Sequence, residues 1–192
     1  MISPETVYLD LKNHYGWQQW WPAETDFEIM VGAILTQGTS WSNVEKAINS
    51  LKSAHALDLE IINEMPRDHL SQLIYSAGFH NVKRDRLKSL SSYLMVNFDG
   101  KIEALKRLPT GTARSQLLAI DGIGPETADA ILLYALGKSV FIVDTYTKRL
   151  FTRLGYSVEQ DSYDSWQAFF VSHMHKTTYT FQQYHALIVE HS

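Results

Sequence analysis

The chain has 192 residues, of which 45% are hydrophobic and 20% are charged, and these values are typical of a packed soluble protein. They exclude the disordered, collagen-like and low-complexity classes, and the length allows one large domain or two small ones. The sequence contains no cysteine, which excludes disulfides, thiolate zinc sites, iron–sulfur clusters and a cysteine nucleophile. It also shows no signal-peptide layout and no apolar run near the roughly 20 residues of a membrane span. We therefore expect a soluble cytoplasmic protein, of bacterial type, that does not engage a membrane.

Charge is distributed unevenly along the chain. The formal net charge is −4, which argues against a generally basic nucleic-acid binder. Residues 81–153 nevertheless carry a net charge of +5, between flanks of −6 over residues 1–80 and −3 over residues 154–192. A basic middle segment is compatible with a surface that faces phosphates, and also with basic side chains scattered over a solvated face. Charge alone favours the scattered arrangement.

Apolar residues recur at helical spacing along almost the whole chain. The segment Ser3-Pro4-Glu5 is typical of a helix start, with a capping residue, a proline and then an acid. In chain order, the spacing predicts helices over residues 27–35, 41–51, 70–77 and 87–94, and on both sides of a turn at residues 122–124. Residues 139–143 form a short apolar run that fits a buried connector. We expect an all-α protein of roughly ten short helices.

The strongest local signal is the turn Gly122-Ile123-Gly124, which lies between two apolar helical stretches. The glycines allow a tight turn and a close approach of the backbone to a ligand. Pro125 suits the first position of the helix that follows. We expect the N–H groups of the turn and of the new helix to be unpaired donors that point outward at the positive end of the helix dipole, so they suit a phosphate. By itself, however, a Gly-x-Gly turn favours a structural corner between two helices without a ligand.

A carboxylate follows this turn at a suggestive distance. Asp144 comes directly after the apolar run and lies 20 residues beyond Gly124, near an expected helix start. A lone aspartate at such a position is usually a helix cap. In combination with the hairpin it is a candidate catalytic carboxylate. Lys148 and Arg149 follow it, and Lys83 lies near an earlier turn; these three are candidates for phosphate contacts.

These features together resemble the helix–hairpin–helix DNA glycosylases of the endonuclease III superfamily. The resemblance is carried by residues 27–39, residues 78–83, the hairpin and residues 143–145. It implies an all-α fold of two lobes: a helical barrel over residues 26–138 that contains the hairpin, and a second lobe built from residues 1–25 and 139–192. It also implies a monomeric base-excision repair enzyme that acts on double-stranded DNA with a damaged, flipped base. In this family the hairpin can hold a monovalent cation through its backbone carbonyls.

Two departures from the family pattern bear on the activity. Family members that also cut the DNA backbone use a lysine amine to form a Schiff base, and here that position is Glu126. A carboxylate cannot form the imine, so we predict a monofunctional DNA N-glycosylase, a hydrolase without AP lyase activity. The family's four-cysteine iron–sulfur loop has no counterpart among these 192 residues, and no other cofactor or metal site is expected.

Three further features resemble the endonuclease III-like 3-methyladenine DNA glycosylases. They are Trp20-Trp21-Pro22, an aromatic residue at Trp41, and a hairpin that carries Glu126 instead of lysine. The resemblance implies that the substrate is an alkylated purine such as 3-methyladenine. It also implies that Asp144 is catalytic. The expected substrate-binding residues are Trp21, Pro22, Gln37, Trp41 and Glu126, among which the family role of Gln37 is to fill the gap left by the flipped nucleotide. The expected DNA-backbone contacts are Gly122, Ile123, Gly124, Lys83, Lys148 and Arg149. Pro125 stands where this subgroup usually has a basic residue.

Two other functions remain open at this point. The protein could be a glycosylase for oxidised or mismatched bases, or a catalytically silent module that binds abasic or damaged DNA. The presence of Asp144 argues against the silent module, because backbone binding does not need a carboxylate that faces phosphates. Four histidines near the end of the chain match no zinc pattern, and we expect structural or solvent-facing roles for His173, His175, His185 and His191.

Overall fold

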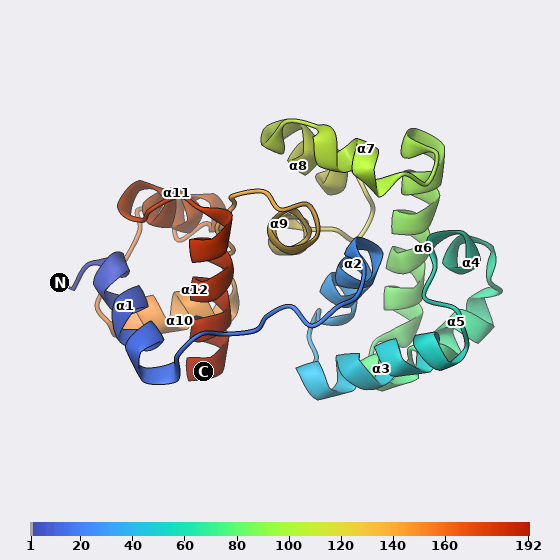
Figure 1. Ribbon diagram of the computed structural model, residues 1–192, viewed down its shortest axis with the longest axis horizontal. Coiled ribbons are helices and arrows are strands. Elements are labelled where there is room, and N and C mark those ends of the chain that lie inside the picture. Colours follow the sequence, from blue (N-terminus) through green and yellow to red (C-terminus); the bar gives the residue numbers. More distant parts are fainter. Residues whose placement is uncertain (1) are drawn as a thin grey trace. The chain divides into compact units, whose positions relative to one another are not determined.

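A computed structural model describes residues 2–192, and over these residues the protein is helical without a strand. The described chain forms twelve α-helices, a 3-10 turn η1 and a π-helical segment η2 (Figure 1). In chain order they are α1 (Pro4–Tyr15), α2 (Asp26–Leu35), α3 (Trp41–Ser53), α4 (Leu59–Glu64), α5 (Arg67–Leu73), η1 (Tyr75–Ala77), α6 (His80–Phe98), α7 (Ile102–Arg107), α8 (Thr110–Leu118), α9 (Pro125–Ala130), η2 (Ile131–Ala135), α10 (Thr145–Arg153), α11 (Tyr163–His173) and α12 (Thr178–His191). None of these helices is long and apolar enough to cross a membrane.

The chain divides into two compact units. One consists of residues 23–131, and the other consists of residues 1–22 together with residues 132–192. The family resemblance implies boundaries at residues 25/26 and 138/139, and the observed divisions fall three and seven residues earlier.

The continuous unit is built around α2. From Met30 to Leu35 this helix is buried on all sides, and it packs against α3, α6 and α9. Thr25 caps α2 by accepting the Glu28 N–H at 3.1 Å. A helix buried all round belongs in the centre of a core, because each fully buried aliphatic side chain stabilises the fold by about 1.5–3 kcal/mol.

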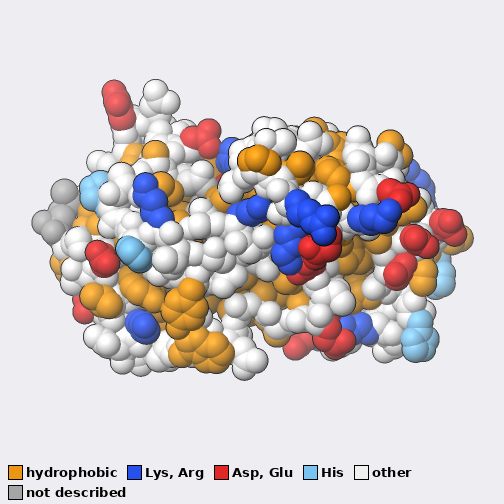
Figure 2. All heavy atoms as spheres, turned by 45° about the horizontal axis from the view of Figure 1, so that its top comes forward, with side chains coloured by type: hydrophobic (Ala, Val, Ile, Leu, Met, Phe, Trp, Pro, Cys, Tyr) orange, Lys and Arg blue, Asp and Glu red, His pale blue; other side chains and the backbone are white. Residues whose placement is uncertain are grey.

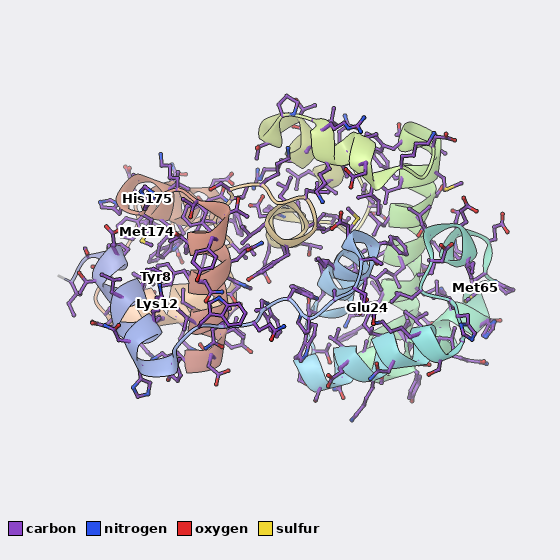
Figure 3. The ribbon with its side chains drawn as sticks, viewed as in Figure 1. Tyr8, Lys12, Glu24, Met65, Met174 and His175 are labelled. Atoms are coloured by element: carbon purple, nitrogen blue, oxygen red, sulfur yellow. The ribbon has the colours of Figure 1, made fainter. Side chains whose placement is uncertain are left out.

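The second unit joins the two ends of the described chain. Helix α1 packs against α12, where the Tyr8 and Tyr184 ring centroids lie 5.2 Å apart (Figure 1). Tyr8 and Lys12 lie one turn apart on α1, with the Lys12 ammonium 5.8 Å from the Tyr8 ring (Figure 3). The predicted cap at Ser3 is confirmed, because its hydroxyl accepts the Thr6 N–H at 3.1 Å.

The apolar run before Asp144 is the buried connector that the sequence predicts. It forms no strand, and residues 140–143 are all buried. Phe141 stacks on Phe170 with ring centroids 4.2 Å apart and meets Phe181 edge-on at 5.3 Å. This aromatic packing anchors the chain directly in front of Asp144.

One predicted helix is interrupted. The apolar spacing over residues 70–77 predicts one helix that stops at Gly78, and the structure has α5 ending at Leu73, followed by η1. Gly78 does end the segment, in a left-handed conformation with φ +68°.

Candidate active site

Asp144 is held at the start of a helix. It is the N-cap of α10, and its Oδ1 accepts the Thr147 N–H at 2.7 Å. The side chain is almost fully buried, at 7% exposed. The buried connector before it and the cap contact after it therefore fix both the position and the orientation of the carboxylate.

The second carboxylate oxygen faces a histidine from α12. Asp144 Oδ2 lies 3.6 Å from His185 Nε2. Burial by itself would raise the pKa of Asp144, but the contact with His185 and the Thr147 N–H lower it by more, so the pKa lies below its ordinary value. A carboxylate that is ionised at neutral pH and shielded from water can oppose a developing positive charge effectively.

A short chain of side chains connects this carboxylate to a tryptophan in the same unit. The Tyr134 hydroxyl lies 2.8 Å from His185 Nδ1, and the Tyr134 ring centroid is 5.4 Å from that of Trp21. Trp21 is half-buried and also contacts Trp20, with centroids 5.6 Å apart, while Pro22 beyond it is exposed. The structure therefore brings together one predicted base-stacking residue and the predicted catalytic residue.

The hairpin lies in the other unit, between α8 and α9. Gly122 adopts φ +82°, and a Cβ placed on it would lie 2.2 Å from Arg86 Cγ, so only glycine fits there. Gly124 is exposed, has a negative φ, and would meet no protein atom within 4 Å of an added Cβ. The protein itself does not require glycine at position 124, and the space beside its Cα is free of protein atoms, although its carbonyl accepts the Ala128 N–H at 2.9 Å.

One part of the predicted hairpin geometry is wrong. The N–H groups of the turn were expected to be unpaired, but the Ile123 N–H donates to the Ile120 carbonyl at 3.1 Å. The Ile123 side chain is also buried, at 5% exposed. Ile123 anchors the turn in the core, and its N–H is not a free donor.

Gln37 rests on the hairpin from the end of α2. Its Nε2 donates to the Thr127 hydroxyl at 2.9 Å and to the Gly122 carbonyl at 3.3 Å. Arg86 donates to the Gln37 Oε1. Two other predicted base-binding residues lie in this unit: Trp41 is half-buried at the start of α3, and Glu126 is exposed in the first turn of α9.

The predicted phosphate contact at Lys83 is wrong. Its side chain is 1% exposed, and its Nζ donates to the Leu35 carbonyl at 2.9 Å and the Ala77 carbonyl at 2.7 Å. Burial, followed by the positive charge of Arg86, lowers the pKa of Lys83 to about 8. The helical register of α6 turns this lysine inward, where it satisfies carbonyls at the ends of two other elements.

This burial predicts an unusual pH dependence of stability. Above pH 8 the folded chain releases the Lys83 proton, whereas the unfolded chain keeps it until about pH 10.4. The wild type should therefore gain about 2 kcal/mol of unfolding free energy between pH 8 and pH 10, relative to a Lys83→Met variant. Urea unfolding of both proteins at the two pH values tests this. The exposed Lys46→Met variant is the control, and an equal pH response of all three proteins would contradict the prediction.

The predicted phosphate contacts Lys148 and Arg149 lie on the surface of α10, and each already contacts another side chain or carbonyl. Lys148 Nζ donates to the Asp161 carbonyl at 2.9 Å and lies 3.5 Å from its carboxylate. The exposed Arg149 guanidinium lies 5.0 Å from the Tyr146 ring centroid. Both side chains can turn toward a phosphate only by exchanging these surface contacts, which are individually weak.

Several basic side chains of residues 81–153 pair with acids within the fold. Arg84 pairs with Asp85, Lys101 with Asp99, and Lys106 with Asp26. In the space-filling view, several basic side chains gather on that face, with acidic side chains beside them (Figure 2). Asp85 and Asp99 are already counted in the net charge of +5, so only pairs with acids outside residues 81–153, such as Lys106 with Asp26 and Lys148 with Asp161, reduce it.

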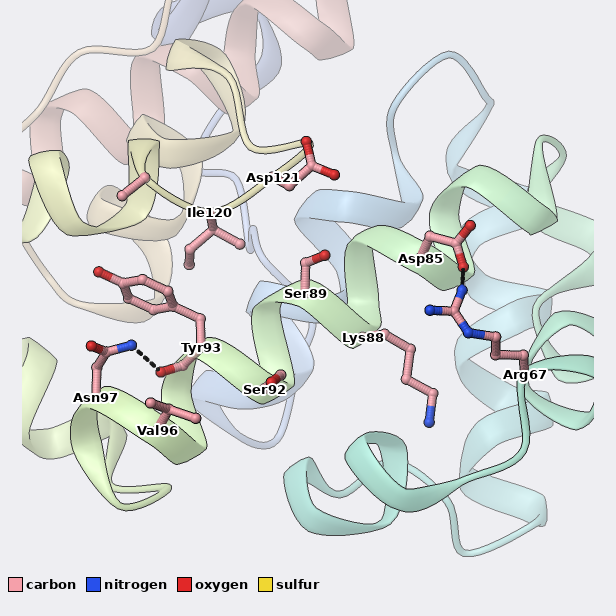
Figure 4. A pocket seen from close by; sticks show the side chains of 11 residues that line it. Arg67, Asp85, Lys88, Ser89, Ser92, Tyr93, Val96, Asn97, Ile120 and Asp121 are labelled. Carbon is pink, nitrogen blue, oxygen red and sulfur yellow. Dashed lines mark hydrogen bonds and ion pairs between the residues drawn. The ribbon is translucent and has the colours of Figure 1, made fainter.

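An open groove of about 670 Å³ lies beside the hairpin on its α6 side (Figure 4). It is lined by the turn residues Ile120 and Asp121, by Tyr93 and Lys88 of α6, and by an Arg67–Asp85 ion pair. None of the predicted catalytic or base-binding residues lines it. Over residues 2–192, no group of three or more histidine, aspartate or glutamate side chains is arranged to hold a metal ion.

Comparison with known proteins identifies the family. Residues 31–172 match the HhH-GPD superfamily of base excision DNA repair proteins. This chain is an HhH-GPD protein. The predicted family and the predicted all-α helix–hairpin–helix fold are therefore confirmed.

Individual relatives agree with this assignment. The HhH-GPD chain is 47% identical over 187 residues to the "Putative DNA repair glycosylase" of Methanocaldococcus jannaschii, covering 96% of this chain and 84% of the relative. Among solved structures, H. pylori 3-methyladenine DNA glycosylase bound to 1,N6-ethenoadenine matches with a TM-score of 0.84 and 30% identity, over 96% of this chain and 94% of that one. An endonuclease III–DNA complex shares the fold, with a TM-score of 0.81 at 20% identity, over 96% of this chain and 82% of that one.

Three residues that contact the candidate site residues were not predicted from the sequence as part of the site. His185 was expected to be structural, and neither Tyr134 nor Arg86 was singled out. His185 and Asp144 are 41 residues apart in sequence and meet only through the packing of α10 against α12. The one available signal was that His185, unlike His173 and His175, falls within a strongly apolar stretch of its helix.

Proposed function

We propose that this protein is a monofunctional DNA glycosylase that hydrolyses the N-glycosidic bond of a flipped, alkylated purine such as 3-methyladenine. The proposal is carried by one observation: an ionised, buried carboxylate, Asp144, lies two side chains away from a half-buried tryptophan, Trp21. The 30% identity to the H. pylori 3-methyladenine DNA glycosylase supports this substrate class.

The chemistry of alkylated purines fits such a site. Alkylation at N3 or N7 makes the purine cationic, so it leaves as a neutral base and needs little help from a general acid. The enzyme has to hold the flipped base and stabilise a cationic sugar. An aromatic face such as that of Trp21 attracts a cationic base by about 0.5–2 kcal/mol through cation–π interaction. Pro22 and Trp41 are further candidates for this stacking.

Asp144 supplies the charge that the reaction requires. As the glycosidic bond breaks, positive charge develops on the sugar as an oxocarbenium ion. An ionised carboxylate held rigidly by its cap contact stabilises that charge without reorganising, and it orients the attacking water. The electrons of the broken bond leave with the base, and water adds at C1′ with loss of a proton.

The lysine positions discussed above favour hydrolysis by water over a lyase reaction, which needs an accessible amine. Glu126 occupies the position at which lyase members of the family have their lysine, and it is exposed in the first turn of α9. Lys83 has the lowered pKa that Schiff-base lysines need, but it is buried and bonded to two carbonyls. We therefore assign no amine nucleophile.

We also propose which residues contact the DNA backbone. We assign these contacts to the hairpin backbone at Gly122 and Gly124 and to Lys148 and Arg149, with Gln37 filling the gap that the flipped nucleotide leaves. Carbonyls of the same turn are candidate ligands for a monovalent cation. Because few basic groups are available, the salt dependence of binding to double-stranded DNA should be modest, with a slope near −0.9 per neutralised phosphate.

Strand cleavage tests the monofunctional assignment. Methylated duplex DNA treated with the protein should contain strand breaks only after hot alkali, because hydrolysis leaves an abasic site with an intact backbone. Borohydride should trap no covalent protein–DNA adduct, since no imine forms. Breaks without alkali, or a trapped adduct, would contradict the assignment. Release of an oxidised or mismatched base in place of an alkylated one would overturn the proposed substrate and leave the enzyme class intact.

A further inference from the structure

His185 contacts the proposed catalytic carboxylate directly, although the sequence suggests only a structural role. We propose that His185 is a positioning residue for Asp144: its Nε2–H holds the carboxylate at Oδ2, while Tyr134 holds the imidazole at Nδ1. This inference rests on the proposed function, because it concerns the same carboxylate. His185 touches Asp144, and we assign it no contact with the DNA.

The contacts around the His185 ring favour arrangements in which Nε2 carries a hydrogen. The Tyr134 hydroxyl lies 2.8 Å from His185 Nδ1 and 3.2 Å from the Gln182 carbonyl, and it has a single hydrogen to give. If that hydrogen goes to Nδ1, the neutral imidazole carries its own hydrogen on Nε2. If the hydroxyl hydrogen goes to the Gln182 carbonyl, the His185 ring must carry a hydrogen on Nδ1 and donate it to the hydroxyl oxygen. In that case only the imidazolium form, which carries a hydrogen on both nitrogens, also presents an Nε2–H to the Asp144 carboxylate.

The remaining arrangement is unfavourable. A neutral ring protonated on Nδ1 would direct the Nε2 lone pair at Asp144 Oδ2, 3.6 Å away, in a place with little water to screen the repulsion. Both favourable arrangements therefore present an N–H to the carboxylate. Tyr134 is itself fixed by its ring contact with Trp21, so the orientation of the imidazole is set by packing as well as by hydrogen bonds.

The two carboxylate oxygens are then held from different helices. Oδ1 takes the Thr147 N–H of α10, and Oδ2 faces His185 of α12. An ionised carboxylate has about four acceptor positions, so two donors leave room for the sugar and the attacking water. The titratable groups around Asp144 are His185 on α12, Tyr134 on η2, and Tyr163 on α11, whose hydroxyl accepts the neighbouring Val143 N–H at 3.4 Å.

Variants of the full-length chain separate a positioning role from a structural one. His185→Leu removes the donor, and His185→Gln keeps an N–H near the place of Nε2. His191→Leu is the matched control, because His191 lies on the same helix and contacts another tyrosine hydroxyl, that of Tyr15, at 2.9 Å. Each variant is compared with the wild type by melting temperature and by single-turnover release of 3-methyladenine from pH 4 to pH 8.

We expect His185→Leu to slow release at pH 7 by about 10-fold, the low end of what one hydrogen bond to a charged group is worth, because the 3.6 Å contact is longer than a direct hydrogen bond. The acid limb of its pH profile should move to higher pH, because only the Thr147 contacts then oppose the effect of burial on the pKa of Asp144. His185→Gln should stay within about threefold of the wild type, and His191→Leu should match it. A folded His185→Leu variant with the wild-type rate and acid limb would overturn the proposal.

A spectroscopic measurement tests the hydrogen position on the His185 ring independently of enzyme activity. Long-range 1H–15N correlation spectra of the labelled wild type should show hydrogen on His185 Nε2 at pH 7.5. A neutral ring protonated on Nδ1 would overturn the proposal even if His185→Leu fails to fold. If the wild type releases no base from any DNA, the proposed function fails, and these spectra still report whether His185 holds Asp144.

Discussion

Replacing Asp144 with asparagine is expected to slow base release from alkylated duplex DNA by about 10²- to 10⁴-fold. Asparagine is as good a helix cap as aspartate, so its side-chain oxygen can still accept the Thr147 N–H. The change therefore removes the negative charge and keeps the local fold. Single-turnover rates measure the effect, with melting temperature and binding to abasic DNA as controls.

The comparison with Asp144→Ala sharpens this result. Alanine removes both the charge and the cap, so it should also destabilise the protein by about 1 kcal/mol. If both variants fold and both release base at the wild-type rate, Asp144 is only a cap. The catalytic assignment would then be wrong.

The second large effect concerns the stability of the hairpin. Arg114 of α8 forms a bidentate ion pair with Asp129 of α9, with Nε–Oδ1 at 2.8 Å and Nη2–Oδ2 at 3.1 Å. The Asp129 side chain is fully buried. Replacing Arg114 with methionine should lower the unfolding free energy by about 3 kcal/mol, because a buried carboxylate loses a bidentate cationic partner.

Two variants control this prediction in urea unfolding. Lys106→Met breaks a more exposed pair with Asp26 and should cost about 0–1 kcal/mol. The double variant Arg114→Met/Asp129→Leu should recover much of the loss, because it removes the buried charge together with its partner. A single Arg114→Met variant as stable as Lys106→Met would show that the hairpin does not depend on this pair.

Local features of the fold could be predicted from the sequence. The Ser3 cap, the turn at Gly122 and the helix start at Asp144 each depend on a few adjacent residues, and each appears where expected. Such features follow from backbone geometry and capping, which neighbouring residues control.

The environment of individual side chains could not be predicted in the same way. Lys83 looked like a phosphate contact because it is basic and near a turn, but the register of α6 points it into the core. His185 looked like one of four unremarkable histidines, but the packing of α12 against α10 sets it beside Asp144. In both cases the deciding partners lie far away in sequence, and single-sequence patterns carry no information about them.

Base release by the wild type tests most directly whether this protein removes alkylated purines from DNA. The protein is incubated with duplex DNA that carries 3-methyladenine, and the supernatant is analysed by chromatography and mass spectrometry. We expect free 3-methyladenine in excess of its spontaneous release, with the DNA strands intact. No enzymatic release of base, from a protein that still binds abasic DNA, would contradict this expectation.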